Sequence, residues 1–247
     1  MRYAGKRALV TGGGSGIGAA IARRLAAEGA EVTVMGRREE QLREVSDSYV
    51  VGDVSVLADC ERAIEHTGPL DLLVNNAGVG GRGGWDETIA INLTGPHQLT
   101  ELAEPGLIER RGAIVNVAST AALYSGSGSA AYNASKAGLV MLTRTLAVKL
   151  GPHGVRANAV CPGWIRTPMG ERSMLTIDED ADAAYARVTE HAPLRRPGSP
   201  EEMAAVVAFL GSDDAAYVTG AVLMADGGSS AVDVLMVEYD RQRDTAE

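Results

Sequence analysis

The chain has 247 residues, of which 45% are hydrophobic, and a formal net charge of -9 at pH 7. This length allows one sizeable core, and the acidic balance excludes nucleic acid and anionic membranes as main partners. The two cysteines, Cys60 and Cys161, stand far apart without metal-ligand spacing, so we expect two buried thiols, no disulfide and no metal site. The sequence contains no apolar run of about 18 residues and no signal-peptide segment, and we expect a cytoplasmic protein.

Short apolar segments alternate along the chain with longer helix-like segments. The strand-like segments are residues 7–11, 31–35, 48–54, 70–77, 112–119, 155–162 and 221–228. The helix-like segments are residues 17–29, 39–46, 56–67, 85–109, 130–151 and 199–212. Right-handed crossovers place helices on both faces of a parallel sheet, so this alternation predicts a doubly wound α/β fold of the Rossmann type. We predict a seven-stranded parallel sheet in a single domain, residues 1–247.

Residues 164–200 interrupt the alternation, because they contain the acidic run Asp178–Asp182 and no strand-like segment. We predict a small helical insertion between the last two strands, which covers a ligand site as a lid. The alternative is a solvated acidic surface loop. The tail, residues 231–247, is rich in charges of both signs and is expected either to fray or to pack on a neighbouring subunit.

The stretch TGGGSGIG, residues 11–18, follows the first strand-like segment and opens the first helix. Glycine allows a tight turn and a close ligand approach, and the helix N-terminus offers N–H groups to a pyrophosphate. With a strand before it and a helix after it, this turn predicts a dinucleotide site, and the alternative is a flexible connector. The residues assigned to the cofactor here are Gly12, Gly14, Ser15, Gly16, Ile17 and Gly18.

The second strand-like segment leads into Gly36, Arg37 and Arg38, where many dinucleotide sites have an acid that binds the adenosine ribose. A guanidinium can bind a 2′-phosphate, which favours NADP(H) over NAD(H). We prefer Arg37 because it is the first side chain after the glycine, and the alternative for both is an exposed pair at a helix start. Asp53 and Val54 are both assigned to the cofactor site. Asp53 is predicted to accept a hydrogen bond from the adenine amino group, or else to form a turn.

Polar residues and glycines follow three further strand-like segments, at Asn75–Gly78, at Ser119 and at Pro162 with Gly163. The carboxyl ends of parallel strands meet at one edge of the sheet, where ligands bind in open α/β folds. We therefore expect these residues to line one site.

The motif YNASK places Tyr132 and Lys136 four residues apart in a helix-like segment, so both project from the same face. A phenol with a pKa of about 10 is a poor proton carrier at neutral pH, and a nearby ammonium favours the phenolate. We therefore expect Lys136 to lower the pKa of Tyr132, as would the positive ring of an oxidised nicotinamide. The alternative is an ordinary surface pair.

The motifs TGGGSGIG, NNAG, YNASK and PGWIRT, with a serine thirteen residues before the tyrosine, together resemble the classical short-chain dehydrogenase/reductase family. The resemblance extends from Lys6 to Ser229. Within the family, the chain is similar to 3-oxoacyl carrier-protein reductase-like and sugar or polyol dehydrogenase-like members. It implies that Tyr132 is the general acid or base and that Ser119 binds the substrate oxygen. It also implies that Lys136 binds the nicotinamide ribose and that Asn92 holds a water of a proton relay.

The resemblance also implies cofactor contacts at two strand ends. On the adenosine side they are Asn75, Ala77 and Gly78, and on the nicotinamide side Pro162, Gly163, Ile165 and Thr167. Pocket-lining candidates that can equally be core residues are Trp85, Leu123, Trp164, Met169 and Met174.

These assignments predict an NADP(H)-dependent oxidoreductase that reduces a ketone or aldehyde to an alcohol, or catalyses the reverse reaction. One alternative is an NAD-dependent dehydrogenase of a sugar, polyol or cyclic diol. The other is a non-catalytic protein that senses the cofactor. The expected partners are a small carbonyl or alcohol substrate and further copies of the chain in a tetramer or dimer.

The sequence departs from the family pattern in the glycine-rich segment 79–91, which is shorter than relatives usually carry. This puts the width of the substrate pocket in doubt. The connection from Arg38 to Asp53 is also short, which puts the adenine pocket in doubt, and the tail past Gly228 leaves the oligomeric contacts open. The four histidines are dispersed and form no metal-ligand set.

Overall fold

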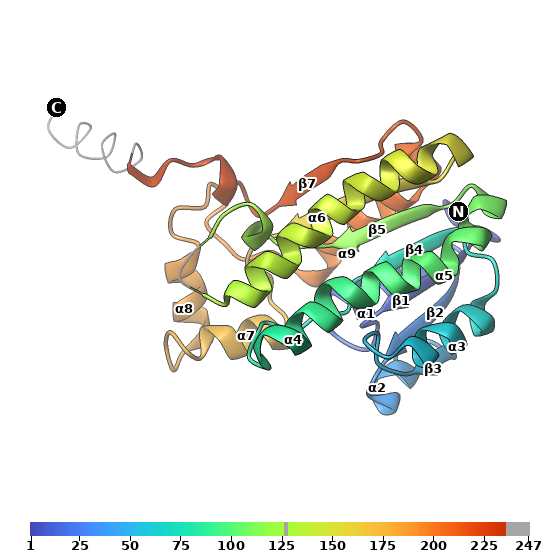
Figure 1. Cartoon of the computed structure of the whole chain (residues 1–247). Helices are drawn as coiled ribbons and strands as arrows, with labels where there is room; N and C mark the ends of the chain where they lie inside the picture. The colour runs from blue at the N-terminus through green and yellow to red at the C-terminus, as the bar shows by residue number, and fades with distance from the viewer. Residues whose placement is uncertain (126–127, 236–247) are drawn as a thin grey trace, which may run out of the picture.

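The computed structural model describes residues 1–125 and 128–235. Within these residues one sheet has seven strands, in the order β3-β2-β1-β4-β5-β6-β7 (Figure 1). All neighbouring strands are parallel, which confirms the predicted doubly wound fold. The strands are β1 (Arg7–Thr11), β2 (Glu31–Gly36), β3 (Ser48–Val51), β4 (Leu72–Asn75), β5 (Ala113–Val117), β6 (Arg156–Pro162) and β7 (Val222–Ala225).

Helices cover both faces of the sheet, as predicted. One face carries α1 (Gly16–Ala27) and α9 (Pro200–Gly211), and the other carries α3 (Leu57–Thr67), α5 (Gly95–Arg110) and α6 (Ala130–Leu150) (Figure 1). Successive strand side chains point to opposite faces of the sheet. Val10 of β1 therefore packs in the core on the face of α1 and α9, and its neighbour Leu9 packs in the core on the face of α3, α5 and α6. A short helix, α2 (Glu39–Arg43), follows β2.

The continuous helix predicted for residues 85–109 is wrong at one point. The structure contains α4 (Gly84–Ile89), a π-helical turn, η1 (Ala90–Thr94), and then α5. Asn92 lies in the π turn, where its buried side chain bonds to groups outside the helix. Such widened turns are frequent at functional sites, and here the turn directs an asparagine into the interior.

The insertion between β6 and β7 is helical, as predicted, and contains α7 (Pro168–Met174) and α8 (Ala181–Val188). Part of the acidic run starts α8, because the Asp180 carboxylate accepts a hydrogen bond from Asp182 N–H at 2.9 Å. Met174, Ala184 and Tyr185 form a small core between the two helices. Met174 is fully buried there, so it is not a pocket-lining residue.

The last described residues, 232–235, follow a short turn at Ser229–Ala231. The remainder of the predicted tail, residues 236–247, lies outside the described residues. In the described part of the chain, none of the helices has both the length and the hydropathy that crossing a membrane requires.

Candidate active site

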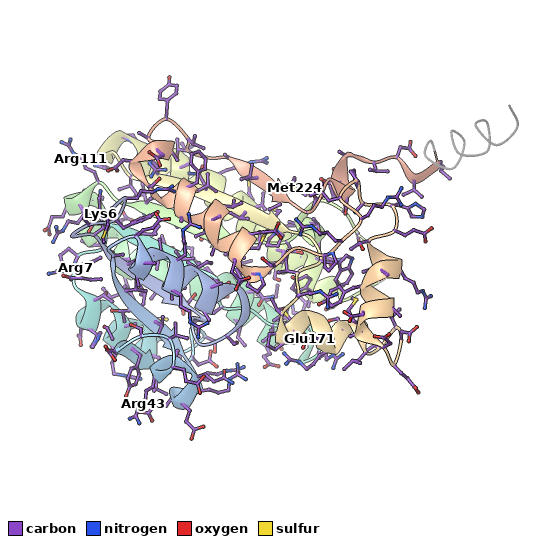
Figure 2. All side chains as sticks on the ribbon, turned by 180° about the vertical axis from the view of Figure 1, so that it is seen from behind. Lys6, Arg7, Arg43, Arg111, Glu171 and Met224 are labelled. Atoms are coloured by element: carbon purple, nitrogen blue, oxygen red, sulfur yellow. The ribbon has the colours of Figure 1, made fainter. Side chains whose placement is uncertain are left out.

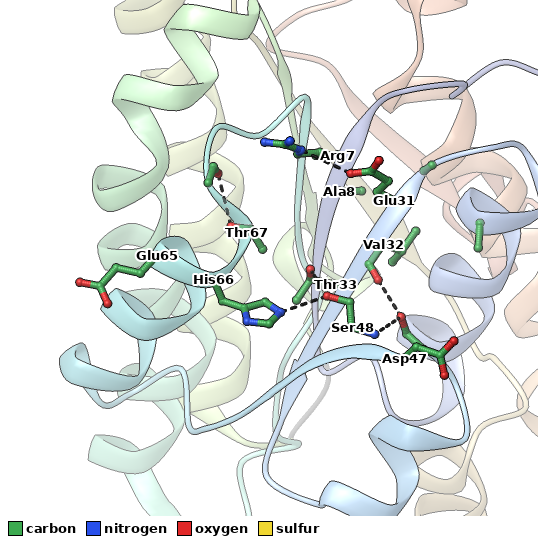
Figure 3. Close-up of a pocket in the computed structure, with 14 residues that line it drawn as sticks. Arg7, Ala8, Glu31, Val32, Thr33, Asp47, Ser48, Glu65, His66 and Thr67 are labelled. Carbon is green, nitrogen blue, oxygen red and sulfur yellow. Dashed lines mark hydrogen bonds and ion pairs between the residues drawn. The ribbon is translucent and has the colours of Figure 1, made fainter.

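Different residues lie at the amino ends and at the carboxyl ends of the strands. Arg7 at the start of β1 and Arg111 before β5 lie at the amino ends of the strands, far from Glu171 of α7 (Figure 2). A hollow of about 680 Å³ at the amino ends of β1 and β2 has polar groups that bond to one another (Figure 3). Ser48 Oγ, for example, lies 2.8 Å from Thr33 Oγ1 and 3.1 Å from His66 Nε2. The predicted site residues lie instead at the carboxyl edge.

Tyr132, Lys136 and Ser119 come together at the carboxyl end of β5. The Ser129 hydroxyl caps α6 by accepting from Tyr132 N–H at 3.2 Å, which fixes the first turn. One turn further on, Lys136 Nζ lies 5.9 Å from the centre of the Tyr132 ring and donates to Val117 O at 2.9 Å. The Ser119 side chain forms a hydrogen bond with the Tyr132 hydroxyl.

Burial controls the protonation of this cluster. It raises the pKa of Tyr132, and the hydrogen bond from Ser119 opposes the shift without cancelling it. It also lowers the pKa of Lys136 from 10.5 to about 8. In the protein alone the pKa of Tyr132 is therefore raised, with burial of the phenol as the largest cause, and the lowering effect of Lys136 stays a prediction. At neutral pH the site holds a neutral phenol beside a lysine that is still mostly cationic.

Asn92 joins the π turn to the loop after β4. Its Oδ1 accepts from Val79 N–H at 2.8 Å, and its Nδ2 donates to Val79 O at 3.0 Å and to Ser135 Oγ at 3.1 Å. A Cβ added to Gly78 would lie 3.3 Å from Asn92 Oδ1 and 3.5 Å from Lys136 Nζ. Asn92 thus lies near the lysine, but its side chain is already bonded to protein. The role of Asn92 in holding a water stays a prediction.

The glycine turn after β1 has the geometry that a pyrophosphate needs. Gly12 and Gly16 have φ of 64° and 54°, a region that other residues avoid. A Cβ at Gly18 would overlap Gly12 O, so the helix can approach the turn only with glycine there. Among the described residues, no side chain caps the N-terminus of α1 at Ser15. The first N–H groups of α1 are therefore available to an anion.

The predicted adenosine side contains two arginines with different partners. Arg37 Nη1 lies 3.5 Å from Asp53 Oδ2, and Arg38 Nη2 donates to Ser15 Oγ of the glycine turn at 3.3 Å. Asp53 also accepts from the Ser55 N–H at 2.9 Å, so its turn-forming role is present as well. Val54 is buried and contacts Gly95, which places its side chain in the core.

The side chain of Asn75 lies in the core, and the predicted place of Asn75 beside the adenosine ribose stays a prediction. Asn75 is 2% exposed, and its Nδ2 donates to Asn116 Oδ1 at 2.8 Å inside the core. The next residue, Asn76, faces the glycine turn instead and donates to Thr11 O at 2.9 Å. Ala77 N–H donates to Thr11 Oγ1 at 3.0 Å, which fastens the end of β4 to the end of β1. Of the two adjacent asparagines, Asn76 is the one whose side chain bonds to the glycine turn.

Residues at the end of β6 and just after it contact both Ser119 and the glycine turn. Cys161 is fully buried, and its Sγ accepts a hydrogen bond from the backbone N–H of Ser119. Pro162 ends β6, and a Cβ at Gly163 would overlap Asp226, the residue that follows β7. Thr167 lies against Gly16 of the glycine turn, because a Cβ added to Gly16 would be 3.3 Å from Thr167 Cβ. Cys161 is a buried free thiol, as predicted, and it also contacts the site through the backbone of Ser119.

The glycine-rich segment after β4 contacts both the start of α6 and the helical insertion. A Cβ at Gly81 would overlap Ser129 Oγ and lie 3.4 Å from Tyr132 Cβ. The next residue, Arg82, donates to Arg172 O of α7 at 3.3 Å. The segment therefore joins the start of α6 to the helical insertion. Exposed apolar side chains at this end are Leu123, Trp85, Trp164 and Met169.

The arrangement accommodates a nicotinamide cofactor and shows no metal centre. Across residues 1–125 and 128–235, no group of His, Cys, Asp and Glu side chains could hold a metal ion. An uncapped helix N-terminus beside a glycine turn suits a pyrophosphate. In the described structure the buried Lys136 ammonium donates one hydrogen bond, to Val117 O, and an ammonium has three N–H groups. The other two suit the hydroxyls of a ribose.

Known reductases and dehydrogenases are similar to this protein over nearly the whole chain. The family described as enoyl-(acyl carrier protein) reductase matches residues 12–230. A 3-oxoacyl-[acyl-carrier-protein] reductase of Thermotoga maritima is 39% identical over 92% of this chain and 99% of its own. A 2-(S)-hydroxypropyl-CoM dehydrogenase of Xanthobacter autotrophicus is 40% identical over 90% and 96% of the two chains. The crystal structure of levodione reductase has a TM-score of 0.87 with 37% identity and covers 94% of this chain and 100% of that one.

Proposed function

The chain belongs to the classical short-chain dehydrogenase/reductase family, whose members are NAD(P)-dependent oxidoreductases, and we propose that it is an NADP(H)-dependent reductase of a ketone or aldehyde. The observation that carries the proposal is the cluster of Tyr132, Ser119 and Lys136 at the carboxyl edge of the sheet. A phenol kept neutral by burial can give a proton to a carbonyl oxygen at neutral pH. The site is therefore prepared for the reductive direction.

The residues divide the work of reduction. A nicotinamide cofactor, when bound, would supply the hydride to the substrate carbon. Tyr132 would give its phenolic proton to the substrate oxygen. The Ser119 hydroxyl binds the same oxygen and stabilises its developing negative charge. The Lys136 ammonium would hold the nicotinamide ribose and stabilise the tyrosinate left after proton transfer. The reverse sequence oxidises the alcohol, with Tyr132 as the base.

The preference for NADP(H) rests on the two arginines after β2. Arg38 reaches Ser15 of the glycine turn, and Arg37 lies at the end of the same strand. A 2′-phosphate between them would accept charge-assisted hydrogen bonds from both guanidinium groups. Asp53 favours the alternative, because its carboxylate pairs with Arg37 and leaves that guanidinium less available. An NAD-dependent dehydrogenase of a sugar, polyol or cyclic diol is therefore the second candidate.

The decisive experiment is Tyr132→Phe, with Tyr217→Phe as its control. Tyr217 is fully exposed, so its substitution should leave turnover unchanged. Turnover of NADPH with a panel of ketones is followed by nicotinamide absorbance, and NADPH affinity by calorimetry. We expect Tyr132→Phe to lower kcat by about 10²–10⁴-fold while NADPH still binds. Intact turnover in Tyr132→Phe would remove the proposed chemistry, and NADPH binding without turnover of any carbonyl by the wild-type protein would favour the cofactor-sensing alternative.

A further inference from the structure

The segment Trp164–Thr167 follows β6 but lies outside the seven-stranded sheet, so other contacts fix its position. After Pro162 the chain leaves the sheet, and only one isolated bridge, between Ile165 and Gly198, follows within the described residues. There Arg166 N–H donates to Gly198 O at 3.0 Å, and Gly198 N–H donates to Trp164 O at 2.9 Å. This bridge holds one side of the segment.

Tyr185 of α8 holds the other side. Its side chain is 0% exposed, and its hydroxyl donates to Ile165 O at 3.1 Å. The hydroxyl also accepts a hydrogen bond from the backbone N–H of Thr167. One phenol therefore spans residues 165–167 by bonding to the backbone at both ends.

The surrounding residues fit closely around this contact. A Cβ at Gly170 would overlap both the Tyr185 hydroxyl and Ile165 O, so α7 can pass this point only with glycine. The Arg166 guanidinium lies 4.7 Å from the centre of the Tyr185 ring and pairs with Asp182 at 2.6 Å. The tyrosine ring is thus enclosed between the small core of the insertion and the segment that it holds.

The segment held in this way contacts the glycine turn after β1. Thr167 lies against Gly16 of the glycine turn, and its Oγ1 accepts from Gly170 N–H at 2.9 Å to start α7. We propose that Tyr185 is a positioning residue that holds Ile165–Thr167 for the nicotinamide half of the cofactor, so that α8 of the insertion is part of the cofactor site. This inference rests on the proposed function, because it assigns a residue to the cofactor of that reaction.

The test compares Tyr185→Phe with Tyr3→Phe. Tyr3 is a matched control, since it is 1% exposed and its hydroxyl also donates to a buried carbonyl, Ala208 O, at 2.6 Å. Each variant keeps its ring and loses one buried hydroxyl. Calorimetry gives the dissociation constants of NADPH and of 2′,5′-ADP, which has the adenosine half without the nicotinamide, and urea unfolding gives the stability of each protein.

We expect Tyr185→Phe to weaken NADPH binding by about tenfold and 2′,5′-ADP binding by less than about twofold. Tyr3→Phe is expected to lower stability and leave both dissociation constants unchanged. Equal weakening of both ligands by Tyr185→Phe, or a loss of stability with unchanged NADPH binding, would overturn the positioning role. A wild-type protein that binds 2′,5′-ADP but gains no affinity from the nicotinamide half would contradict the positioning role as well. A wild-type protein that binds neither NADPH nor NADH would contradict the proposed function itself.

Discussion

Replacement of Lys136 by methionine is expected to stabilise the fold while it abolishes turnover. Lys136 is 4% exposed, and burial lowers its pKa from 10.5 to about 8. At about 1.36 kcal/mol per pKa unit, keeping the ammonium charged inside the protein costs about 3 kcal/mol at pH 7. Methionine fills a similar volume without charge, and the lost hydrogen bond to Val117 O offsets about 1 kcal/mol. The expected net gain in unfolding free energy is about 2 kcal/mol.

The gain should depend on pH in a defined direction. Because the folded-state pKa lies below the unfolded value, the unfolded chain binds the Lys136 proton more tightly between about pH 8 and 10.5. The cost is therefore complete below about pH 8 and disappears as the pH rises past 10.5, above which both states are neutral. The difference between Lys136→Met and the wild type should shrink over the same interval.

Urea unfolding followed by circular dichroism measures this difference at neutral and alkaline pH. Lys149→Met is the control on the same helix, since Lys149 is half exposed and its Nζ pairs with Glu104 Oε2 at 2.6 Å. That pairing raises the pKa of Lys149, so its substitution should give no gain in stability. If Lys136→Met is less stable than the wild type at pH 7, burial of the ammonium does not destabilise the folded protein by this amount.

Three further predictions concern catalysis and cofactor binding. The kcat/KM for ketone reduction should fall as the pH rises through about 8, where Lys136 loses its proton, and a profile that is flat through this region would exclude that role. Arg38→Ala should weaken NADPH binding about tenfold and NADH binding little, and Arg37→Ala should act in the same direction; equal effects on the two cofactors, measured by calorimetry, would remove the NADP preference. Gly18→Ala should prevent cofactor binding because its methyl group would overlap Gly12 O, and unchanged NADPH affinity would show that the turn is not the pyrophosphate site.

The fold was largely predictable because its signals are local. Alternating strand-like and helix-like segments predicted seven parallel strands, since each βα unit shows its own pattern. The π turn at Ala90–Thr94 was not predictable, because its residues suit an α-helix. What directs Asn92 inward is its bonding to Val79 and Ser135, and these partners are brought to it only by the folded chain.

The site was less predictable where contacts decide the role of a residue. Asn75 and Asn76 are equally polar in sequence, and both faces of β4 are buried, so no alternation shows which side chain points to the cleft. Cys161 bonds to the backbone of Ser119, which follows a different strand. Tyr185 of α8 bonds to Ile165 O, twenty residues earlier in the chain. The sequence shows neither contact. The direction of the Tyr132 pKa shift also depends on burial, which the spacing of YNASK does not reveal.

Burial is the feature that separates Lys136 from an ordinary lysine. The sequence allowed an ordinary surface pair, but a surface lysine costs nothing to keep charged, as Lys149 illustrates on the same helix. The buried Lys136 ammonium lowers the stability of the protein alone, and within the described residues the hydrogen bond to Val117 O uses one of its three N–H groups. A ligand that brings hydroxyl groups to the other two recovers part of that cost as binding free energy. Stability and cofactor affinity are therefore coupled through one side chain, which is the arrangement expected of a functional site and not of a structural one.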